Sequence, residues 1–202
     1  MSRTLGVLIS GRGSNLQAIL DAIAEGRLDA RVGVVVSNQA DAQGLERAEK
    51  AGVPTAVVSH KDYDSREAFD EAVLAQLKNH DVDIVCLAGF MRILSSVLVR
   101  AFPSRILNIH PSLLPAFLGL HAQRQAVEHG AKVSGCTVHL VDEELDHGPI
   151  LLQVSVPVEE RDSEESLSAR ILEQEHKLYP VAIQLIVDGK VRVDGRRAVI
   201  EA

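Results

Sequence analysis

The feature that most constrains the fold is a regular alternation of short β-branched runs with amphipathic stretches over the first three-quarters of the chain. Leu5 to Ile9 is apolar or glycine at every position, which is typical of a strand buried on both faces. Apolar residues then recur at helical spacing from Leu16 to Ile23, as in a helix packed on a sheet. The repetition predicts an α/β fold: an open, mostly parallel, twisted sheet with helices on both faces.

The same pattern predicts the order of the remaining elements. Further strands are expected at residues 31–37, 53–58, 82–88 and 105–109, with helices at 42–51, around 69–77 and at 94–101. In the last third, 133–141 and 150–158 predict an antiparallel hairpin. A long helix follows from about Ser163, with Asp162 or Ser163 as cap and a kink at Pro180. Without a repeat or linker, we expect one domain over residues 1–202.

Composition excludes several classes of function. The chain is 46 % apolar and 24 % charged, as in an ordinary globular protein, and its net charge of −7 argues against a nucleic-acid surface. The apolar run in MSRTLGVLIS is shorter than that of a signal peptide, so we do not expect secretion, and no run approaches the ~20 apolar residues of a membrane span. Cys86 and Cys136 lie in apolar stretches, as buried free thiols do in a reducing compartment. We therefore expect a cytoplasmic protein that binds neither membrane nor metal.

Three loops follow strands of the predicted parallel sheet and carry reactive side chains. They are GRGSN after the first strand, GFMRIL after Ala88, and NIHPSLLP after Leu107. In open α/β sheets, ligands bind beyond the carboxyl ends of the strands. The fold and the chemistry therefore point to the same edge of the sheet.

The loop Gly11 to Asn15 has the character of a phosphate site. Its glycines allow close approach, and the free N–H groups at the start of the following helix attract an anion. Ser14, with Gln17 three residues later, is a candidate cap for that helix. The spacing matches neither a Walker loop nor a full GxGxxG, so a monophosphate suits it better than a dinucleotide. A tight turn that merely needs glycine is the alternative.

Asn108 and His110 are separated by one residue on a strand, so they face the same side of it. Pro111 favours an extended or turning backbone at His110, where the strand reaches the cleft. An amide donor beside an imidazole suits acyl transfer, with one group stabilising an oxyanion and the other moving protons. Taken alone, a histidine at a strand end is more often a structural residue.

The segments LISGRGSNLQAI, VVSNQADAQGLERA, LAGFMRIL, LNIHPSLLPAF and GCTVHLVDEELDHGPI together resemble the phosphoribosylglycinamide formyltransferases, and the similarity extends to DSEESLSARILEQEHKLYP. The resemblance implies transfer of the formyl group of 10-formyltetrahydrofolate, as co-substrate, to the amine of 5-phosphoribosyl-glycinamide in purine synthesis. The NIHPSLLP and LDxGP motifs are shared by folate-dependent formyltransferases, and the GxGSN loop narrows the match. Small-molecule substrates and a monomer or homodimer are then expected.

The resemblance also assigns roles to residues of this chain. The substrate phosphate is expected at Gly13, Ser14 and Asn15, and the glycinamide end of the substrate at Glu175. Folate is expected at Arg66, Met91, Arg92, Ile93, Leu94 and Asn108. The catalytic residues are expected to be Asn108, His110 and Asp146.

Two of these assignments have unequal support from the residues themselves. Glu175 lies on the same helical face as Ile171 and Ala182, so its carboxylate projects from an apolar stripe and needs a partner. A carboxylate that flanks the stripe and reaches water is the alternative. Asp146 is one of four acids in a single turn, and only the LDxGP resemblance selects it. Its expected role is to pair with His110 and keep the imidazolium available, or to hold a water that relays a proton.

The expected mechanism has three steps. The neutral amine attacks the formyl carbon, Asn108 and protonated His110 stabilise the oxyanion, and a proton then passes from the amine to the folate nitrogen near Asp146. The sequence departs from the family at Leu118, where proline is expected, and at Arg12, where asparagine is frequent. Neither change removes an expected catalytic group.

Rival readings are a folate-dependent enzyme with methionyl-tRNA, a sugar amine or water as acceptor, and a non-catalytic module that binds a nucleoside monophosphate. The tRNA enzyme is expected to carry a basic carboxyl-terminal domain and the hydrolase an amino-terminal regulatory domain. We expect neither here, since the chain ends at Ala202 with net charge −7 and its first strand begins by Leu5. The binding module leaves Asn108, His110 and Asp146 unexplained.

Overall fold

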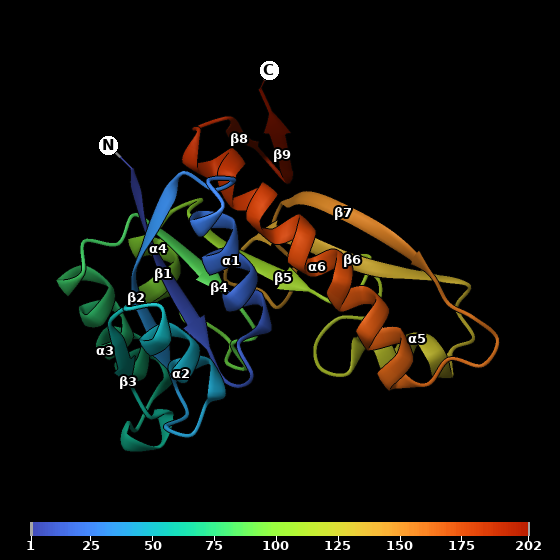
Figure 1. Ribbon diagram of the computed structural model, residues 1–202, viewed down its shortest axis with the longest axis horizontal. Helices are drawn as coiled ribbons and strands as arrows, with labels where there is room; N and C mark the ends of the chain where they lie inside the picture. Colours follow the sequence, from blue (N-terminus) through green and yellow to red (C-terminus); the bar gives the residue numbers. More distant parts are fainter. Residues whose placement is uncertain (1, 202) are drawn as a thin grey trace.

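The computed structural model describes residues 2–201 and contains one nine-stranded sheet in the order β3-β2-β1-β4-β5-β6-β7-β9-β8 (Figure 1). The strands are β1 Arg3–Ile9, β2 Ala30–Ser37, β3 Thr55–Val57, β4 Ile84–Leu87, β5 Ile106–His110, β6 Val133–Leu140, β7 Ile150–Pro157, β8 Val191–Asp194 and β9 Arg197–Ile200. The helices are α1 Ser14–Ala24, α2 Gln43–Lys50, α3 Arg66–Asn79, α4 Ser96–Ala101, α5 Ala122–Glu128 and α6 Glu164–Val187, with a short 3-10 turn at His60–Asp62.

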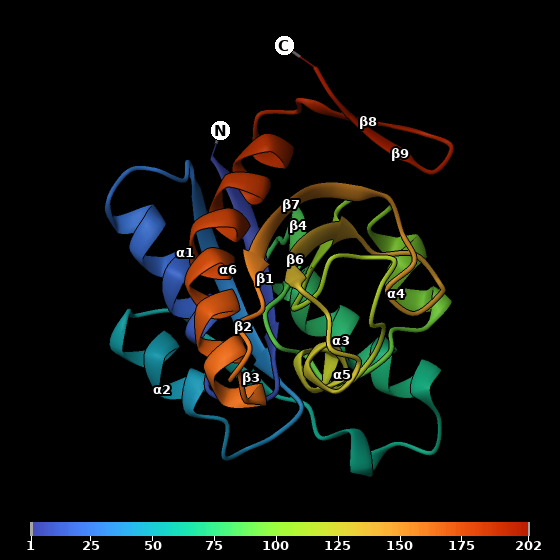
Figure 2. The ribbon, with the colours of Figure 1, turned by 90° about the vertical axis from the view of Figure 1, so that its right-hand side faces the viewer.

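The pairing of strands confirms the predicted fold class. The neighbouring strands β3, β2, β1, β4 and β5 pair in parallel. Strand β6 pairs antiparallel with β5, and β6 and β7 form the predicted hairpin. Helices cover both faces: Figure 2 shows α1, α2 and α6 on one side of the parallel strands and α3 and α4 on the other. The α/β crossovers therefore bring the carboxyl ends of β1, β4 and β5 to one edge.

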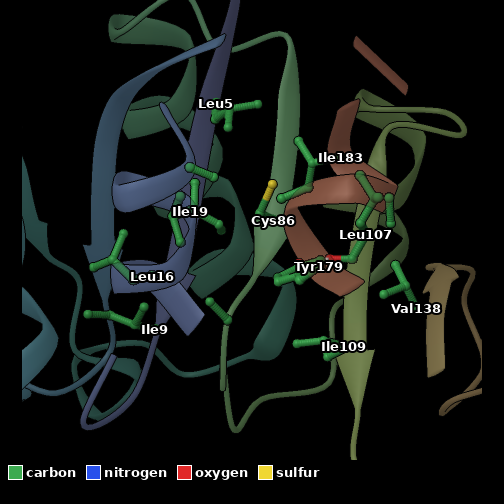
Figure 3. Packing of buried hydrophobic residues seen from close by; sticks show 14 of the residues in the cluster. Leu5, Ile9, Leu16, Ile19, Cys86, Leu107, Ile109, Val138, Tyr179 and Ile183 are labelled. Carbon is green, nitrogen blue, oxygen red and sulfur yellow. Dashed lines mark hydrogen bonds between the residues drawn. The ribbon is translucent and has the colours of Figure 1, made fainter. Parts of the chain in front are cut away.

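Alternation along the buried strands divides the core into two layers. Leu5, Val7 and Ile9 of β1 pack with α1, α2 and α6, whereas Leu8 packs with α3 and α4 on the opposite face. In Figure 3, Tyr179 and Ile183 of α6 lie against the β4 and β5 side of the first layer. The Tyr179 hydroxyl lies 2.9 Å from the Leu87 carbonyl oxygen and 3.0 Å from that of Leu107. It therefore ties α6 to the two strands that lead into the candidate site.

One local expectation, the cap of α1, is wrong, and a second, the kink of α6 at Pro180, stays a prediction. Helix α1 is not capped by Ser14: Gly13 occupies the cap position with φ 68°, no side chain caps the helix, and Ser14 is its first residue. Glycine adopts this left-handed conformation without the strain of a side chain, so the backbone conformation of Gly13, and no side-chain cap, marks the start of the helix. Helix α6 runs from Glu164 to Val187 through Pro180 without a break. Pro180 is buried, and packing on the sheet offsets the one missing backbone hydrogen bond.

Other elements either agree with the sequence pattern or were missed by it. Ser163 caps α6 as expected, accepting from the backbone N–H of Ser166. The pattern did not predict α5 or the carboxyl-terminal hairpin of β8 and β9. That hairpin joins the sheet through one parallel pair, Ile150 with Arg197, and stands beyond the end of α6 in Figure 2. Among residues 2–201, no helix has the length and apolar character needed to cross a membrane.

Candidate active site

Three loops meet at the edge formed by the carboxyl ends of β1, β4 and β5. In the register of the sheet, Leu8 of β1 pairs with Leu87 of β4, and Leu87 pairs with Asn108 of β5. The chain leaves each strand at nearly the same level, and the Ser10 N–H donates to the Gly89 carbonyl at 3.0 Å. The glycine loop, the segment after β4 and the end of β5 are therefore neighbours, as the parallel sheet predicts.

Asn108 is oriented by a histidine that the sequence analysis did not select. The Nδ2 of Asn108 lies 3.1 Å from Nε2 of His139, and Nδ1 of His139 lies 3.0 Å from the Leu140 carbonyl oxygen. A carbonyl only accepts, so Nδ1 carries the proton and Nε2 is left to accept from the Asn108 amide. Burial lowers the pKa of His139, which favours this neutral form. The second N–H of the Asn108 amide remains free to donate.

His110 and Asp146 face each other at the end of β5. Nδ1 of His110 lies 3.5 Å from Oδ2 of Asp146, and both side chains are more than nine-tenths buried. The other ring nitrogen, Nε2, lies 2.9 Å from the Phe117 carbonyl oxygen and donates to it. Each ring nitrogen thus has an acceptor opposite it, so a second proton at Nδ1 would meet the Asp146 carboxylate. The arrangement suits an imidazole that holds and releases a proton.

Asp146 connects the histidines and the loop that follows β5. Its Oδ2 accepts from the Gly119 N–H at 2.8 Å, and its Oδ1 lies 3.9 Å from Nε2 of His139. Its backbone adopts a left-handed φ of 49°. Asn108, His139, Asp146 and His110 therefore lie in one cluster. The structure brings together the three residues that the sequence analysis selected as catalytic.

A cavity of about 460 Å³ opens beside this cluster. It is bounded by the loop after β5, the loop that carries Asp146, and Arg196 from the carboxyl-terminal hairpin. Leu118 and Leu145 line it and are each nearly half exposed. Leu118 is the residue found where the family pattern led us to expect proline, and it lies in a loop rather than in an element of secondary structure.

The glycine loop is braced by the neighbouring helix α2. A Cβ on Gly13 would lie 2.6 Å from the Gly44 Cα, and the Gly44 N–H donates to the Gly11 carbonyl at 3.0 Å. Nε of Arg47 donates to the Arg12 carbonyl at 2.8 Å. Arg12 itself is exposed. The loop is thus held from behind, while the start of α1, with Ser14 as its first residue, presents free N–H groups.

Asn15 and Glu175 meet between the glycine loop and α6. Nδ2 of Asn15 donates to Oε2 of Glu175 at 2.8 Å, and the two residues are only 7 % and 6 % exposed. Burial raises the pKa of Glu175, and the hydrogen bond from Asn15 opposes that rise. Oδ1 of Asn15 has no partner among the described residues. The pair therefore presents acceptors to a donor-rich ligand such as an amine or a hydroxyl group.

The segment after β4 presents apolar side chains at the same edge. Met91 is 60 % exposed and Ile93 is 47 % exposed, whereas Leu94 is buried. Oγ of Ser10 accepts from the Met91 N–H at 2.8 Å and donates to Oδ1 of Asn38 at 2.6 Å. One hydroxyl therefore joins the start of the glycine loop to the segment expected to hold folate.

A buried carboxylate fixes the far end of that segment. Oδ2 of Asp70, on α3, accepts from the Ser95 N–H at 2.5 Å, directly after Leu94. Burial raises the pKa of Asp70. Arg66 begins α3 and is half exposed, with Glu67 as its nearest carboxylate at 3.9 Å. Arg92 is exposed as well. The structure does not join either arginine to the catalytic cluster.

His139 is the residue that the sequence analysis missed. It lies on β6 directly opposite Asn108, inside the motif GCTVHLVDEELDHGPI. A polar side chain in the interior of a buried strand was the available indication, but the pairing of β6 with β5 is needed to interpret it. Within residues 2–201, no group of three or more His, Cys, Asp or Glu side chains is placed to hold a metal ion. Cys86 and Cys136 are free and buried.

A family model, a characterised relative and a solved structure all relate this chain to formyltransferases. The model of the family described as formyl transferase matches residues 3–183. The chain is 49 % identical over 187 residues to phosphoribosylglycinamide formyltransferase of Escherichia coli strain K12, covering 93 % of this chain and 88 % of that protein. It resembles the crystal structure of glycinamide ribonucleotide transformylase 1 from Symbiobacterium toebii with a TM-score of 0.98 and 56 % identity, over 99 % of this chain and 94 % of that one.

A longer relative contains a similar region. The chain is 51 % identical over 189 residues to the trifunctional purine biosynthetic protein adenosine-3 of Bos taurus. The match covers 94 % of this chain but only 19 % of the length of that relative. The similarity therefore concerns one part of the bovine protein.

Proposed function

We propose a formyl transfer to a glycinamide amine for this chain, which belongs to the formyl transferase family. The formyl group comes from 10-formyltetrahydrofolate, and the acceptor is the primary amine of 5-phosphoribosyl-glycinamide, in purine synthesis. The names of the Escherichia coli and Symbiobacterium toebii relatives support this acceptor. The observation that carries the proposal is the meeting of Asn108, His110 and Asp146 at the edge where the glycine loop and the exposed apolar segment also end.

The amine is the nucleophile in the proposed reaction. Its lone pair attacks the formyl carbon, a nitrogen–carbon bond forms, and the carbonyl oxygen becomes an oxyanion. The free N–H of the Asn108 amide donates to that oxyanion, and His139 holds the amide in this orientation through its Nε2. His110, in its protonated form, contributes positive charge beside the oxyanion, while its two ring nitrogens keep their acceptors in Asp146 and the Phe117 carbonyl.

Proton transfer completes the reaction. The bond between the formyl carbon and the folate nitrogen breaks, and the proton lost by the amine passes to that nitrogen. Asp146 stabilises the imidazolium of His110 across 3.5 Å and is kept in place by the Gly119 N–H. A water held near Asp146 relays the proton. No covalent intermediate with the enzyme is required, since the amine itself is a competent nucleophile.

The two substrates approach from different segments. The phosphate binds at Gly13, Ser14 and Asn15, where the start of α1 offers backbone N–H groups and partial positive charge. The glycinamide end reaches Glu175, whose buried carboxylate favours a cationic or donor-rich partner. Folate lies on Met91, Arg92, Ile93 and Leu94 and against Asn108, with Arg66 near its charged end. Residues 1–202 act as one domain, in the cytoplasm, where the free buried thiols Cys86 and Cys136 stay reduced.

One assay tests the acceptor. Formation of tetrahydrofolate from 10-formyltetrahydrofolate is followed with and without 5-phosphoribosyl-glycinamide. We expect turnover only when the acceptor is present, and a formylated product in equal amount. Release of formate at a similar rate without the acceptor would show that the protein hydrolyses 10-formyltetrahydrofolate and does not transfer the formyl group. Absence of turnover in both arms, with intact folding, would favour a binding module.

A further inference from the structure

The carboxyl-terminal hairpin reaches back to the loop that carries Asp146. Arg196 lies in the turn between β8 and β9, and its Nη2 donates to the His147 carbonyl at 2.9 Å. Its Nη1 contacts Nε2 of the same His147 ring. Next to this contact, Arg197 pairs with Ile150 of β7, so the hairpin is anchored beside the loop. A segment outside residues 3–183, which the family model matches, thus contacts the neighbour of a proposed catalytic residue.

The His147 ring continues the contact across the loop. Its Nδ1 lies 2.8 Å from Oδ2 of Asp142, so the proton of the neutral ring resides on Nδ1 and is donated to the carboxylate. Nε2 is then an acceptor for the Arg196 guanidinium. Oδ1 of Asp142 accepts from the Glu144 N–H at 3.0 Å, which closes the loop on itself. Arg196, His147 and Asp142 therefore connect both ends of the segment 142–147 to the hairpin.

The rest of that segment has few other restraints. Glu143, Glu144 and Leu145 are exposed, and the ion pair that Glu143 makes with Arg100 at 3.2 Å is itself exposed and therefore weak. The two ends of the segment lie close together, since a Cβ on Gly148 would lie 1.9 Å from the Leu140 carbonyl oxygen. Asp146 needs a left-handed backbone to direct its carboxylate towards His110. Such a conformation persists when the surrounding contacts hold it.

We propose that Arg196 is a positioning residue, through which the carboxyl-terminal hairpin holds the loop 142–147 so that Asp146 faces His110. The role in catalysis rests on the proposed formyl transfer, whereas the restraint of the loop does not. The side-chain hydrogen bonds of Arg196 go to His147, so Arg196 acts on Asp146 through that residue. Its effect is therefore expected on turnover more than on binding of the glycinamide substrate, whose proposed binding contacts at Gly13 to Asn15 and at Glu175 do not involve the loop 142–147.

The test compares Arg196→Ala with Arg197→Ala, a matched control that removes the next arginine, the exposed first residue of β9, whose side chain forms no hydrogen bond or ion pair within residues 2–201. Amide hydrogen exchange is measured on the ligand-free protein at residues 142–148 and, as a reference, in β6. We expect at least about fivefold faster exchange at 142–148 in Arg196→Ala, with β6 unchanged, because a locally released loop opens independently of the core. Arg197→Ala should match the wild type.

Steady-state kinetics provide the second measurement. We expect Arg196→Ala to lower kcat between about threefold and a hundredfold, as displacement of a catalytic group does, with KM for phosphoribosyl-glycinamide nearly unchanged. His147→Ala removes the same restraint from the loop side, so the double variant should be no slower than the slower single variant. Additive losses, or exchange and kcat in Arg196→Ala equal to those of Arg197→Ala, would overturn the proposal. A wild type without turnover would refute the proposed function alone, since the exchange measurement still tests the restraint.

Discussion

Asn15 donates from Nδ2 to Oε2 of Glu175 at 2.8 Å, which joins the first loop of the chain to its last long helix across 160 residues of sequence. Both side chains are buried, and the carboxylate is surrounded by an apolar stripe that includes Ile171 and Ala182. A carboxylate in such surroundings costs stability unless a partner compensates for lost hydration. Asn15 is that partner in the ligand-free protein, and we propose that the substrate amine is a second hydrogen-bond partner of the Glu175 carboxylate.

Replacement of Glu175 by Gln should separate stability from substrate binding. Burial raises the pKa of Glu175 above its ordinary value of 4.5. At pH values between the ordinary pKa and the raised pKa of the folded state, the folded state binds more protons than the unfolded state. The free energy of unfolding therefore falls as pH rises through this interval and stays lower above it. Glu175→Gln removes this loss and should have a higher urea midpoint than the wild type at pH 8, with the difference shrinking towards pH 4. Equal midpoints at pH 8 would contradict the cost of the buried charge.

The same substitution should weaken substrate binding. A charge-assisted contact to the amine contributes about 1.5–3 kcal/mol, so KM for phosphoribosyl-glycinamide should rise on the order of tenfold to a hundredfold in Glu175→Gln. Folate KM should change little, because the folate segment lies after β4. A matched control is Glu173→Gln, two residues away on the exposed side of α6. A normal KM in Glu175→Gln would remove Glu175 from the proposed substrate contacts.

Asp146→Asn should lower kcat by about a hundredfold or more, because the imidazolium of His110 loses the carboxylate that lies 3.5 Å away. Glu144→Gln, an exposed acid of the same loop, is the control and should keep near-normal kcat. Rapid-quench or spectrophotometric turnover at saturating substrates measures both. If the two variants lose activity equally, the acidic character of the loop matters and the selection of Asp146 is wrong.

His139→Phe should disorient Asn108 without removing it. The ring would still fill the site, but the acceptor for Nδ2 of Asn108 would be lost, and we expect kcat to fall about two- to tenfold, in keeping with the ~0.5–1.5 kcal/mol net value of a hydrogen bond. Burial lowers the pKa of His139, so the unfolded chain takes up its proton first as pH falls below about 6.5. The wild type should therefore lose stability in that range more steeply than His139→Phe. Urea titrations at pH 5 and pH 7 measure the difference.

Ser10→Ala should affect folate binding through the backbone. It removes the acceptor for the Met91 N–H and the donor to Asn38, two bonds worth about 1 kcal/mol each, so folate KM should rise about three- to thirtyfold. The exposed Ser155→Ala on β7 is the control. The affinity of a non-reactive folate analogue, measured by calorimetry, reports the effect directly. An unchanged affinity would show that the segment keeps its position without this hydroxyl.

Tyr179→Phe should lower the free energy of unfolding by about 1–3 kcal/mol, because two buried strand carbonyls lose a shared donor. The aromatic ring stays, so packing in Figure 3 is retained. Urea unfolding at neutral pH measures the change. Kinetic constants of the folded variant should stay close to those of the wild type, and a large loss of kcat at full folding would give Tyr179 a role in the site.

Hydrophobic periodicity was enough to predict the α/β class, the sheet edge and most of the elements, because it reports burial directly. It also placed Asn108 and His110 on one strand and Glu175 on an apolar face. Short-range periodicity does not report which strands pair or how a glycine loop ends. For that reason the pattern assigned the α1 cap to Ser14 rather than Gly13, and it did not predict β8 and β9.

The assembly of the site depends on contacts between segments that are far apart in the sequence. The role of His139 can be inferred because β6 pairs with β5 and places His139 opposite Asn108. Asp146 is distinguished from its three acidic neighbours by a left-handed backbone and by contacts to Gly119 and His110. Asn15 meets Glu175, and Arg196 meets His147, across long separations in sequence. These contacts depend on strand order and helix packing, which many residues determine jointly and no local pattern encodes.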